Sequence, residues 1–141
     1  MKICNANVAN FLGVIEFKEL NHMLIYDAPI CFVTNIDEHW VSFWISKSHI
    51  EIYDGLGESS GLKDNAYFVN FLCNNLINRN LNITRQIQND ESVLCGQFSV
   101  ICLQLRSCNV LFDAINTHFS ENLEKNDDLI IYLFKDLTKI I

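Results

Sequence analysis

Proline, glycine and long hydrophobic runs are all scarce in this chain. It has one proline and five glycines among 141 residues, which leaves little room for flexible linkers. Its longest apolar stretches, such as residues 129–134, are far shorter than the ~18 residues that a membrane-spanning helix needs. Half of the residues are hydrophobic and 19% are charged, which is typical of a folded globular chain. We therefore expect a single domain over residues 1–141, large enough to bury a core without disulfide bonds.

Basic residues are also few. The chain has 10 Lys and Arg residues against 17 Asp and Glu residues, a net charge of −7. Phosphate binding needs clustered Lys and Arg, so this balance argues against a surface that coats DNA or RNA. A small local basic patch stays compatible with the composition.

A secretory signal is lacking as well. Asn5, Asn7 and Asn10 interrupt any apolar run near the N-terminus, so we expect a protein kept inside a cell, in a reducing compartment. The six cysteines are then expected to be free thiols. No C-x-x-C pair occurs and the Cys and His spacings match no zinc site, so we expect no metal.

Two kinds of hydrophobic pattern predict the secondary structure. Runs rich in β-branched and aromatic residues, or alternating between apolar and polar residues, predict strands. Apolar residues at three- and four-residue steps predict helices. The expected strands are residues 30–35, 40–45, 50–53 and 81–88, and the expected helices are residues 64–78, 95–105, 110–118 and 128–140.

The order of these elements predicts the fold class. Three strands come first, then a helix, a fourth strand and three more helices. The polar turn over residues 46–49 joins two of the strands into a hairpin. We therefore expect an α+β fold with a central, mostly antiparallel sheet and helices packed around it.

Four polar residues stand at the ends of these elements: His39, Asp54, Gln88 and Cys95. Catalytic groups are commonly presented at such ends, on a rigid scaffold. Cys95 begins a predicted helix, whose N-terminus stabilises the thiolate that makes a cysteine nucleophilic. The competing reading is a core cysteine, because free cysteines are among the most buried residues.

The other three residues can complete a nucleophilic site. His39 can take the thiol proton, and Asp54, on the neighbouring strand of the hairpin, can fix the imidazole tautomer. Gln88, seven residues before Cys95, can donate to an oxyanion beside the Cys95 backbone N–H. Gln86 lies on the same face of the predicted strand and is the alternative donor. Taken singly, each has an ordinary reading: a surface histidine, a turn aspartate or an exposed glutamine.

Together these residues resemble the adenain family, the adenovirus-type cysteine endopeptidases related to ubiquitin-like-protein proteases. The specific part is Gln88 followed by Ser92-x-x-Cys95-Gly96-x-Phe98. His39-Trp40, the Asp54-Gly55-Leu56-Gly57 turn and Phe11-Leu12-Gly13 support it, so the similarity covers roughly residues 11–105. The family has a papain-like fold with a permuted order of catalytic residues.

The resemblance implies a role for each residue of the site. Cys95 would be the nucleophile, His39 the general base, Asp54 the acid that orients the histidine and Gln88 the oxyanion donor. Trp40, Gly55 and Gly96 would contact the substrate, a protein or polyprotein. It would be cleaved after small residues, at Gly-Gly or Gly-x sites, because a narrow tunnel covers the active site.

The family also implies a biological setting. Its members mature the structural precursors of DNA viruses or Maverick/polinton-type elements, in the host nucleus or cytoplasm and in the virion. Adenoviral members need a disulfide-linked peptide and DNA. Residues 78–85 hold no cysteine to anchor that peptide, Cys73 lies in the preceding helix, and the chain is acidic. We therefore expect neither cofactor, no membrane partner, and no nucleic-acid binding beyond a local patch.

Two other functions stay open. An isopeptidase that removes ubiquitin-like modifiers would share the motif but needs a broad surface for a folded substrate. A degraded protease fold could serve as a binding or scaffolding protein. The apolar segment 128–141 is expected to pack on the core, or else to form a partner surface.

Overall fold

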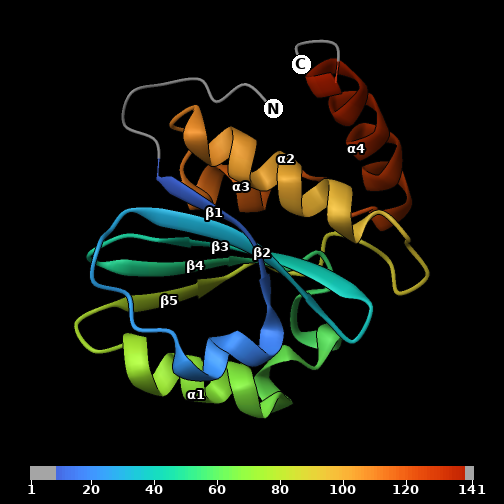
Figure 1. Ribbon diagram of the computed structural model, residues 1–141. Helices are drawn as coiled ribbons and strands as arrows, with labels where there is room; N and C mark the ends of the chain where they lie inside the picture. Colours follow the sequence, from blue (N-terminus) through green and yellow to red (C-terminus); the bar gives the residue numbers. More distant parts are fainter. Residues whose placement is uncertain (1–8, 139–141) are drawn as a thin grey trace.

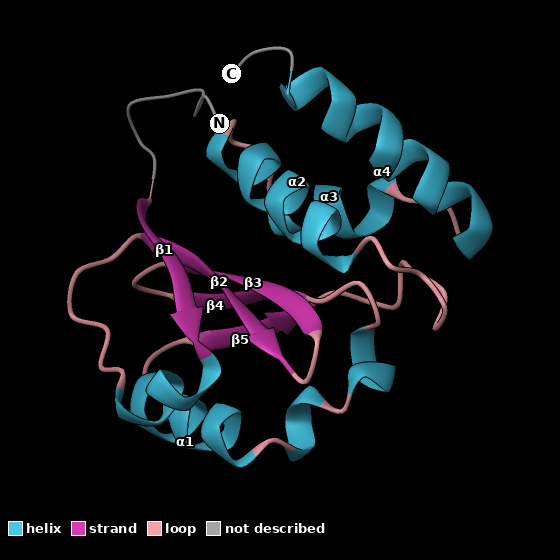
Figure 2. Ribbon diagram, turned by 45° about the vertical axis from the view of Figure 1, so that its right-hand side comes forward, coloured by secondary structure: helices cyan, strands magenta, loops and turns pink. Residues whose placement is uncertain are grey.

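The computed structural model describes residues 9–138, which form a sheet sandwiched between two helical layers (Figure 1). One layer holds the 3₁₀ helix at Phe17–His22 and α1, and the other holds α2, α3 and α4 (Figure 2). The strands are β1 (Asn10–Glu16), β2 (Ile30–Ile36), β3 (His39–Ile45), β4 (His49–Tyr53) and β5 (Asn80–Ile83). The helices are α1 (Ala66–Asn75), α2 (Cys95–Ser107), α3 (Phe112–His118) and α4 (Leu123–Thr138).

The five strands lie side by side in their chain order, β1-β2-β3-β4-β5. The two hairpin pairings, β2 with β3 and β3 with β4, are antiparallel. The two outer pairings, β1 with β2 and β4 with β5, are parallel. The α+β class is thus confirmed, and the sheet is mixed rather than mostly antiparallel.

Side chains along the central strands point alternately to the two faces of the sheet, and this divides the core into two clusters. Cys31 and Val33 of β2 belong to a cluster with Phe98 of α2, on one face of the sheet. Phe32, between them, belongs to a second cluster with Phe71 of α1 on the other face. Because successive side chains of a strand point to opposite faces, one buried strand supplies both clusters. This explains why the predicted strands are so uniformly apolar.

Differences from the predicted elements lie at the edges of the fold. The β1 strand was not predicted, because its residues are largely exposed on one edge of the sheet. The predicted strand 81–88 ends as β5 at Ile83, because the chain then turns across the Asp54–Gly57 segment: Ile87 N and Gln88 N both donate to Gly55 O at 2.8 Å. Helix α4 begins five residues before the predicted start, and residues 139–140 of that prediction lie outside the described residues.

The expectation of six free thiols is wrong at one described position. Cys31, Cys73, Cys95 and Cys102 are free, but Cys108 is disulfide-bonded. Cys4, Asn5 and Asn7 lie outside the described residues.

Within residues 9–138, no helix combines the length and the hydrophobicity that crossing a bilayer requires.

Candidate active site

The site begins with a pair formed across the β3–β4 hairpin. His39 is the first residue of β3, after a tight turn in which Asp37 and Glu38 have positive φ of 50° and 67°. Asp54 directly follows β4. Antiparallel pairing brings these ends together, so that His39 Nε2 lies 2.6 Å from Asp54 Oδ1. The carboxylate is fully buried and the imidazole is 15% exposed, which shields their interaction from water.

Asp54 is held in place by hydrogen bonds on its backbone and side chain. The Thr84 hydroxyl donates to Asp54 O at 2.7 Å and accepts from Asp54 N at 2.9 Å. Leu56 N donates to the same Oδ1 that faces the histidine, at 3.1 Å. Thr84 thus ties the Asp54 backbone to β5's extension, and the carboxylate cannot rotate without breaking its contact with the following turn.

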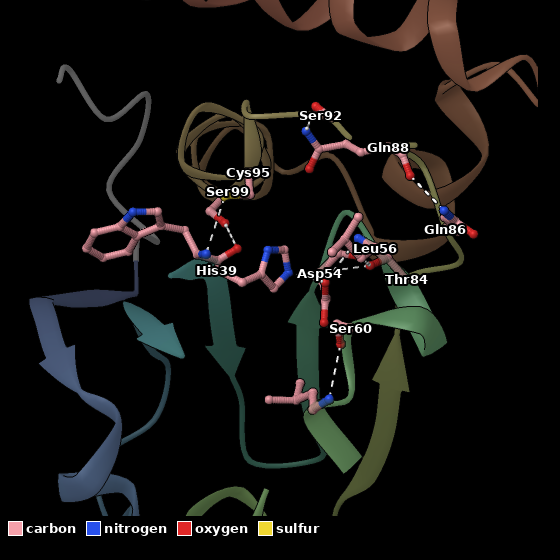
Figure 3. A network of polar contacts seen from close by, with 12 residues as sticks. His39, Asp54, Leu56, Ser60, Thr84, Gln86, Gln88, Ser92, Cys95 and Ser99 are labelled. Carbon is pink, nitrogen blue, oxygen red and sulfur yellow. Dashed lines mark hydrogen bonds and ion pairs between the residues drawn. The ribbon is translucent and has the colours of Figure 1, made fainter. Parts of the chain in front are cut away.

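Cys95 lies on the other side of His39, as the first residue of α2 (Figure 3). Its Sγ accepts from Trp40 N at 3.4 Å, and His39 is near enough to lower the pKa of its thiol. Since Nε2 of His39 faces Asp54, the ring has Nδ1 left for the sulfur. The imidazole thus bridges a carboxylate and a thiol that are distant in the sequence.

Two serines fix α2 against β3 and thereby set this geometry. Ser99, one helical turn after Cys95, donates from Oγ to Trp40 O at 3.2 Å. Ser42 in turn donates from Oγ to Ser99 O at 3.1 Å. Both serines are buried, so these bonds tie the start of the helix to the strand that carries His39.

The contacts shift the protonation of both reactive groups. Burial by itself lowers the pKa of His39, but the hydrogen bonds and charges of Asp54 and Cys95 outweigh it and raise that pKa to about 9. The hydrogen bond from His39 lowers the pKa of the Cys95 thiol; burial opposes this effect, and the Trp40 N–H adds to it. Both shifts favour a thiolate beside an imidazolium.

The N-terminus of α2 places backbone N–H groups next to the sulfur. Leu94, at the N-cap, provides no side-chain cap, and the first N–H groups of a helix have no intrahelical partner. The Gly96 N–H is hydrogen-bonded to Cys95 and lowers the pKa of its thiol. A helix N-terminus favours negative charge, here at the position of Cys95.

Gln88 lies near these donors but is held differently from the expectation. It is fully buried, in the loop after β5 rather than at the end of a strand. Its Nε2 donates to Ser92 Oγ at 2.8 Å, and its Oε1 has no hydrogen-bond partner among the described residues (Figure 3). The alternative residue, Gln86, donates to Gln88 O and Asp90 Oδ1 and so faces the 88–90 loop.

The three residues expected to contact substrate fall in two places. Trp40 and Gly96 line a pocket of about 350 Å³, which continues along α2. A Cβ on Gly96 would lie 3.4 Å from the Trp40 ring, so the two residues approach closely. Gly55 is buried against Gln88 instead: a Cβ there would come within 1.9 Å of Gln88 Oε1. The lack of a side chain at Gly55 leaves the space that the Gln88 side chain occupies.

Sequence reasoning missed the residues that hold the site together, namely Thr84, Ser99, Ser42 and Asp127. Small polar side chains carry no distinctive spacing, and their partners lie tens of residues away along the chain. Within residues 9–138, no group of three or more His, Cys, Asp or Glu side chains is arranged to hold a metal ion.

The comparisons with known proteins bear on the fold. Neither the scan against family models nor the search of curated proteins finds a match. Among solved structures, the chain is similar to ASFV pS273R protease, with a TM-score of 0.52 and 14% identity over 84% of this chain and 55% of that one. It spans about half the length of that protease.

A second solved structure covers almost the whole chain. The central domain of the uncharacterized Lpg1148 protein from Legionella pneumophila aligns with a TM-score of 0.55 and 13% identity, over 96% of this chain and 90% of that one. Similarity at such low identity shows the fold. This chain therefore shares a fold with a known protease.

Proposed function

We propose that this protein is a thiol endopeptidase of the adenain type. The observation that carries the proposal is the convergence of Cys95, His39 and Asp54 at the uncapped N-terminus of α2. A thiol polarised by an imidazole, which is oriented in turn by a buried carboxylate, is the arrangement that activates a cysteine nucleophile. The fold shared with pS273R protease adds independent support.

The reaction proceeds through an acyl-enzyme. The Cys95 thiolate attacks the scissile carbonyl carbon, and the electron pair of the C=O bond moves to oxygen. Backbone N–H groups of the first turn of α2, together with the Gln88 amide, donate to that oxyanion. When the C–N bond breaks, the His39 imidazolium gives its proton to the leaving amine. His39 then takes a proton from water, whose attack on the thioester releases the acid and restores the thiolate.

We include in the proposal a preference for small residues at the cleavage site, which the family resemblance implies. The Trp40 indole, next to Gly96, would be the side chain that limits their size. Processing of structural precursor proteins at Gly-Gly or Gly-x sites is the substrate class that fits this geometry and the family resemblance.

Mass spectrometry of a Gly-Gly-containing peptide incubated with the protein tests the proposal. We expect cleavage after glycine by the wild-type chain, and none by Cys95→Ala, because removal of the nucleophile eliminates the acyl-enzyme. Cys73→Ala is the matched control, since Cys73 is an exposed free cysteine in α1 on the opposite face of the sheet. Cleavage that survives Cys95→Ala would disprove the assignment.

The same experiment separates the competing functions. An isopeptidase would cleave a folded ubiquitin-like precursor much faster than the short peptide. A binding protein that has lost catalysis would cleave neither, and its Cys95 would be alkylated no faster at mildly acidic pH than its other cysteines.

A further inference from the structure

The Gln88 carboxamide is the end of a polar chain that reaches into α4. Gln88 Nε2 donates to Ser92 Oγ at 2.8 Å, and Ser92 Oγ donates to Asp127 Oδ1 at 2.9 Å. Ser92 lies three residues before Cys95, whereas Asp127 comes from the second turn of α4. These two hydrogen bonds therefore connect Gln88, the proposed oxyanion donor, to α4, a helix that holds none of the triad residues.

The chemistry of these groups fixes which of them donates and which accepts in each hydrogen bond. A carboxylate oxygen only accepts, so the single Ser92 hydroxyl proton is committed to Asp127. The lone pairs of Ser92 Oγ are then left to accept, from Leu94 N at 3.3 Å and from Gln88 Nε2. The two ends of a carboxamide are nearly equal in shape, so packing alone does not distinguish them. Asp127 thus determines that the NH₂ group of Gln88, and not its oxygen, faces the start of α2.

A neighbouring residue fixes the other end of the same loop. Asn126, which is 1% exposed, donates from Nδ2 to Ile87 O at 2.8 Å. Consecutive residues of α4 therefore hold the chain directly before Gln88 and four residues after it. The position of the carboxamide, as well as its orientation, depends on α4.

We propose that Ser92 and Asp127 are positioning residues, which hold the Gln88 NH₂ group toward the oxyanion formed at Cys95. The inference rests on the proposed function, because it assigns the hydrogen-bonded chain to a step of that reaction. One Nε2 hydrogen is used by Ser92, and we assign the second hydrogen to the oxyanion. Loss of a well-placed oxyanion donor typically lowers kcat by ~10²–10³.

Kinetics of two reactions at the same sulfur test this proposal. The variants are Ser92→Ala, which removes the acceptor, and Asp127→Ala, which frees the hydroxyl proton to donate to Gln88 Oε1. We expect each to lower kcat for a Gly-Gly peptide by ~10-fold or more with little change in KM, because the oxyanion exists only after attack. The rate of Cys95 alkylation by iodoacetamide should stay within about twofold, since that displacement forms no oxyanion.

Matched variants separate positioning from a general structural role. Asp128→Ala removes the next carboxylate of α4, which is exposed, and should leave kcat unchanged. Ser92→Thr keeps the hydroxyl and should restore most of kcat. In a Gln88→Ala background, Ser92→Ala should have no further effect, because its action passes through Gln88. An additive loss, a parallel fall in alkylation, or full kcat in Asp127→Ala would overturn the proposal.

A measurement that does not need turnover distinguishes this failure from a failure of the proposed function. The side-chain ¹⁵N–H₂ signals of Gln88, assigned by their loss in Gln88→Ala, should shift in Ser92→Ala and Asp127→Ala but not in Asp128→Ala. If the wild-type chain cleaves no peptide, the proposed function fails whatever the spectrum shows. If the chain cleaves peptide and the Gln88 signals do not shift, the positioning role alone is wrong.

Discussion

At the scale of single residues, His39 and Cys95 change each other's protonation. The pKa of His39 is raised because a buried carboxylate and a sulfur face the imidazole. The pKa of the Cys95 thiol is lowered, chiefly because His39 lies beside it. Other buried cysteines show the opposite behaviour. Burial raises the pKa of Cys31 to about 12 and raises that of Cys102 as well. Of the three described cysteines whose pKa is shifted, Cys95, which lies beside a histidine, is the one whose pKa is lowered.

This difference predicts how activity depends on pH. Cleavage requires the thiolate and the imidazolium together, so it should fall as acid protonates Cys95 and fall again as pH rises through about 9, where His39 loses its proton. Alkylation of Cys95 should persist at pH values below those at which an ordinary cysteine reacts, while Cys31 and Cys102 stay unmodified. Rates of peptide cleavage and iodoacetamide labelling, followed by mass spectrometry across pH, check both limits. A labelling profile for Cys95 that matches the exposed Cys73 would contradict the prediction.

Gly55 makes a second prediction at this scale. A methyl group there would lie within 3 Å of the Oε1, Cδ and Cγ atoms of Gln88, so Gly55→Ala must displace the buried glutamine. We expect a loss of ~1–3 kcal/mol in the free energy of unfolding, as for other overpacked sites, and a lower kcat. Denaturant unfolding and peptide cleavage measure the two effects. The double variant Gly55→Ala/Gln88→Ala should regain stability relative to Gly55→Ala, since the clashing atoms are gone; an equally unstable double variant would locate the strain elsewhere.

At the scale of secondary structure, three residues of the site lie at or next to the ends of elements, whereas Gln88 lies in a loop. The β3–β4 hairpin places His39 opposite Asp54, and α2 starts at Cys95, after the loop that holds Gln88. The N-terminal capping differs between α1 and α2. The α1 helix has Asn65 as an N-cap, whereas α2 begins without a side-chain cap, which leaves its donors for chemistry. The α3 helix, like α2, begins without a side-chain cap, so α1 is the helix of these three that is capped by a side chain.

The cap of α1 can be tested directly. Asn65 Oδ1 accepts from Tyr67 N at 3.0 Å and from Phe68 N at 3.1 Å. Asn65→Ala should therefore cost ~0.5–2 kcal/mol in the free energy of unfolding, and Asn65→Ser, which keeps a capping oxygen, should cost much less. Thermal or denaturant unfolding of the two variants gives the comparison. Equal stabilities would mean that the cap does not contribute.

At the scale of the whole molecule, α2 is fixed to the sheet at both ends. Near Cys95 the connection is made by Ser99 and Ser42, and at the far end Arg106 Nε reaches Glu51 Oε1 of β4 at 3.0 Å. The Arg106 guanidinium also lies over the Trp44 ring, 4.9 Å from its centre. Because Cys95 begins a helix that is held at two points, its distance to His39 is set by the packing of the layers.

Removing the far connection should destabilise the fold. Arg106→Met keeps an apolar side chain but removes the guanidinium that lies over Trp44, and it leaves Glu51, 3% exposed, with the Tyr53 hydroxyl as its side-chain partner among the described residues. Breaking a buried ion pair on one side typically costs ~3–5 kcal/mol, and the partial exposure of Arg106 places the expected loss at the lower end. Chemical denaturation measures it. The double variant Glu51→Gln/Arg106→Met should recover part of the loss, since no charge is then left buried.

The sequence by itself determined the central strands, the helices and the polar residues at their ends. Apolar alternation and helical periodicity are local properties, and a hairpin of fixed length brings His39 to Asp54 with little help from the rest of the chain. Only the tertiary structure decided the parallel outer strands, the turn of the chain away from the sheet after Ile83, and the hydrogen-bond partners of Gln88 and Asp127. These depend on contacts between residues tens of positions apart, where single polar side chains leave no pattern in the sequence and where packing of the layers selects one pairing among many.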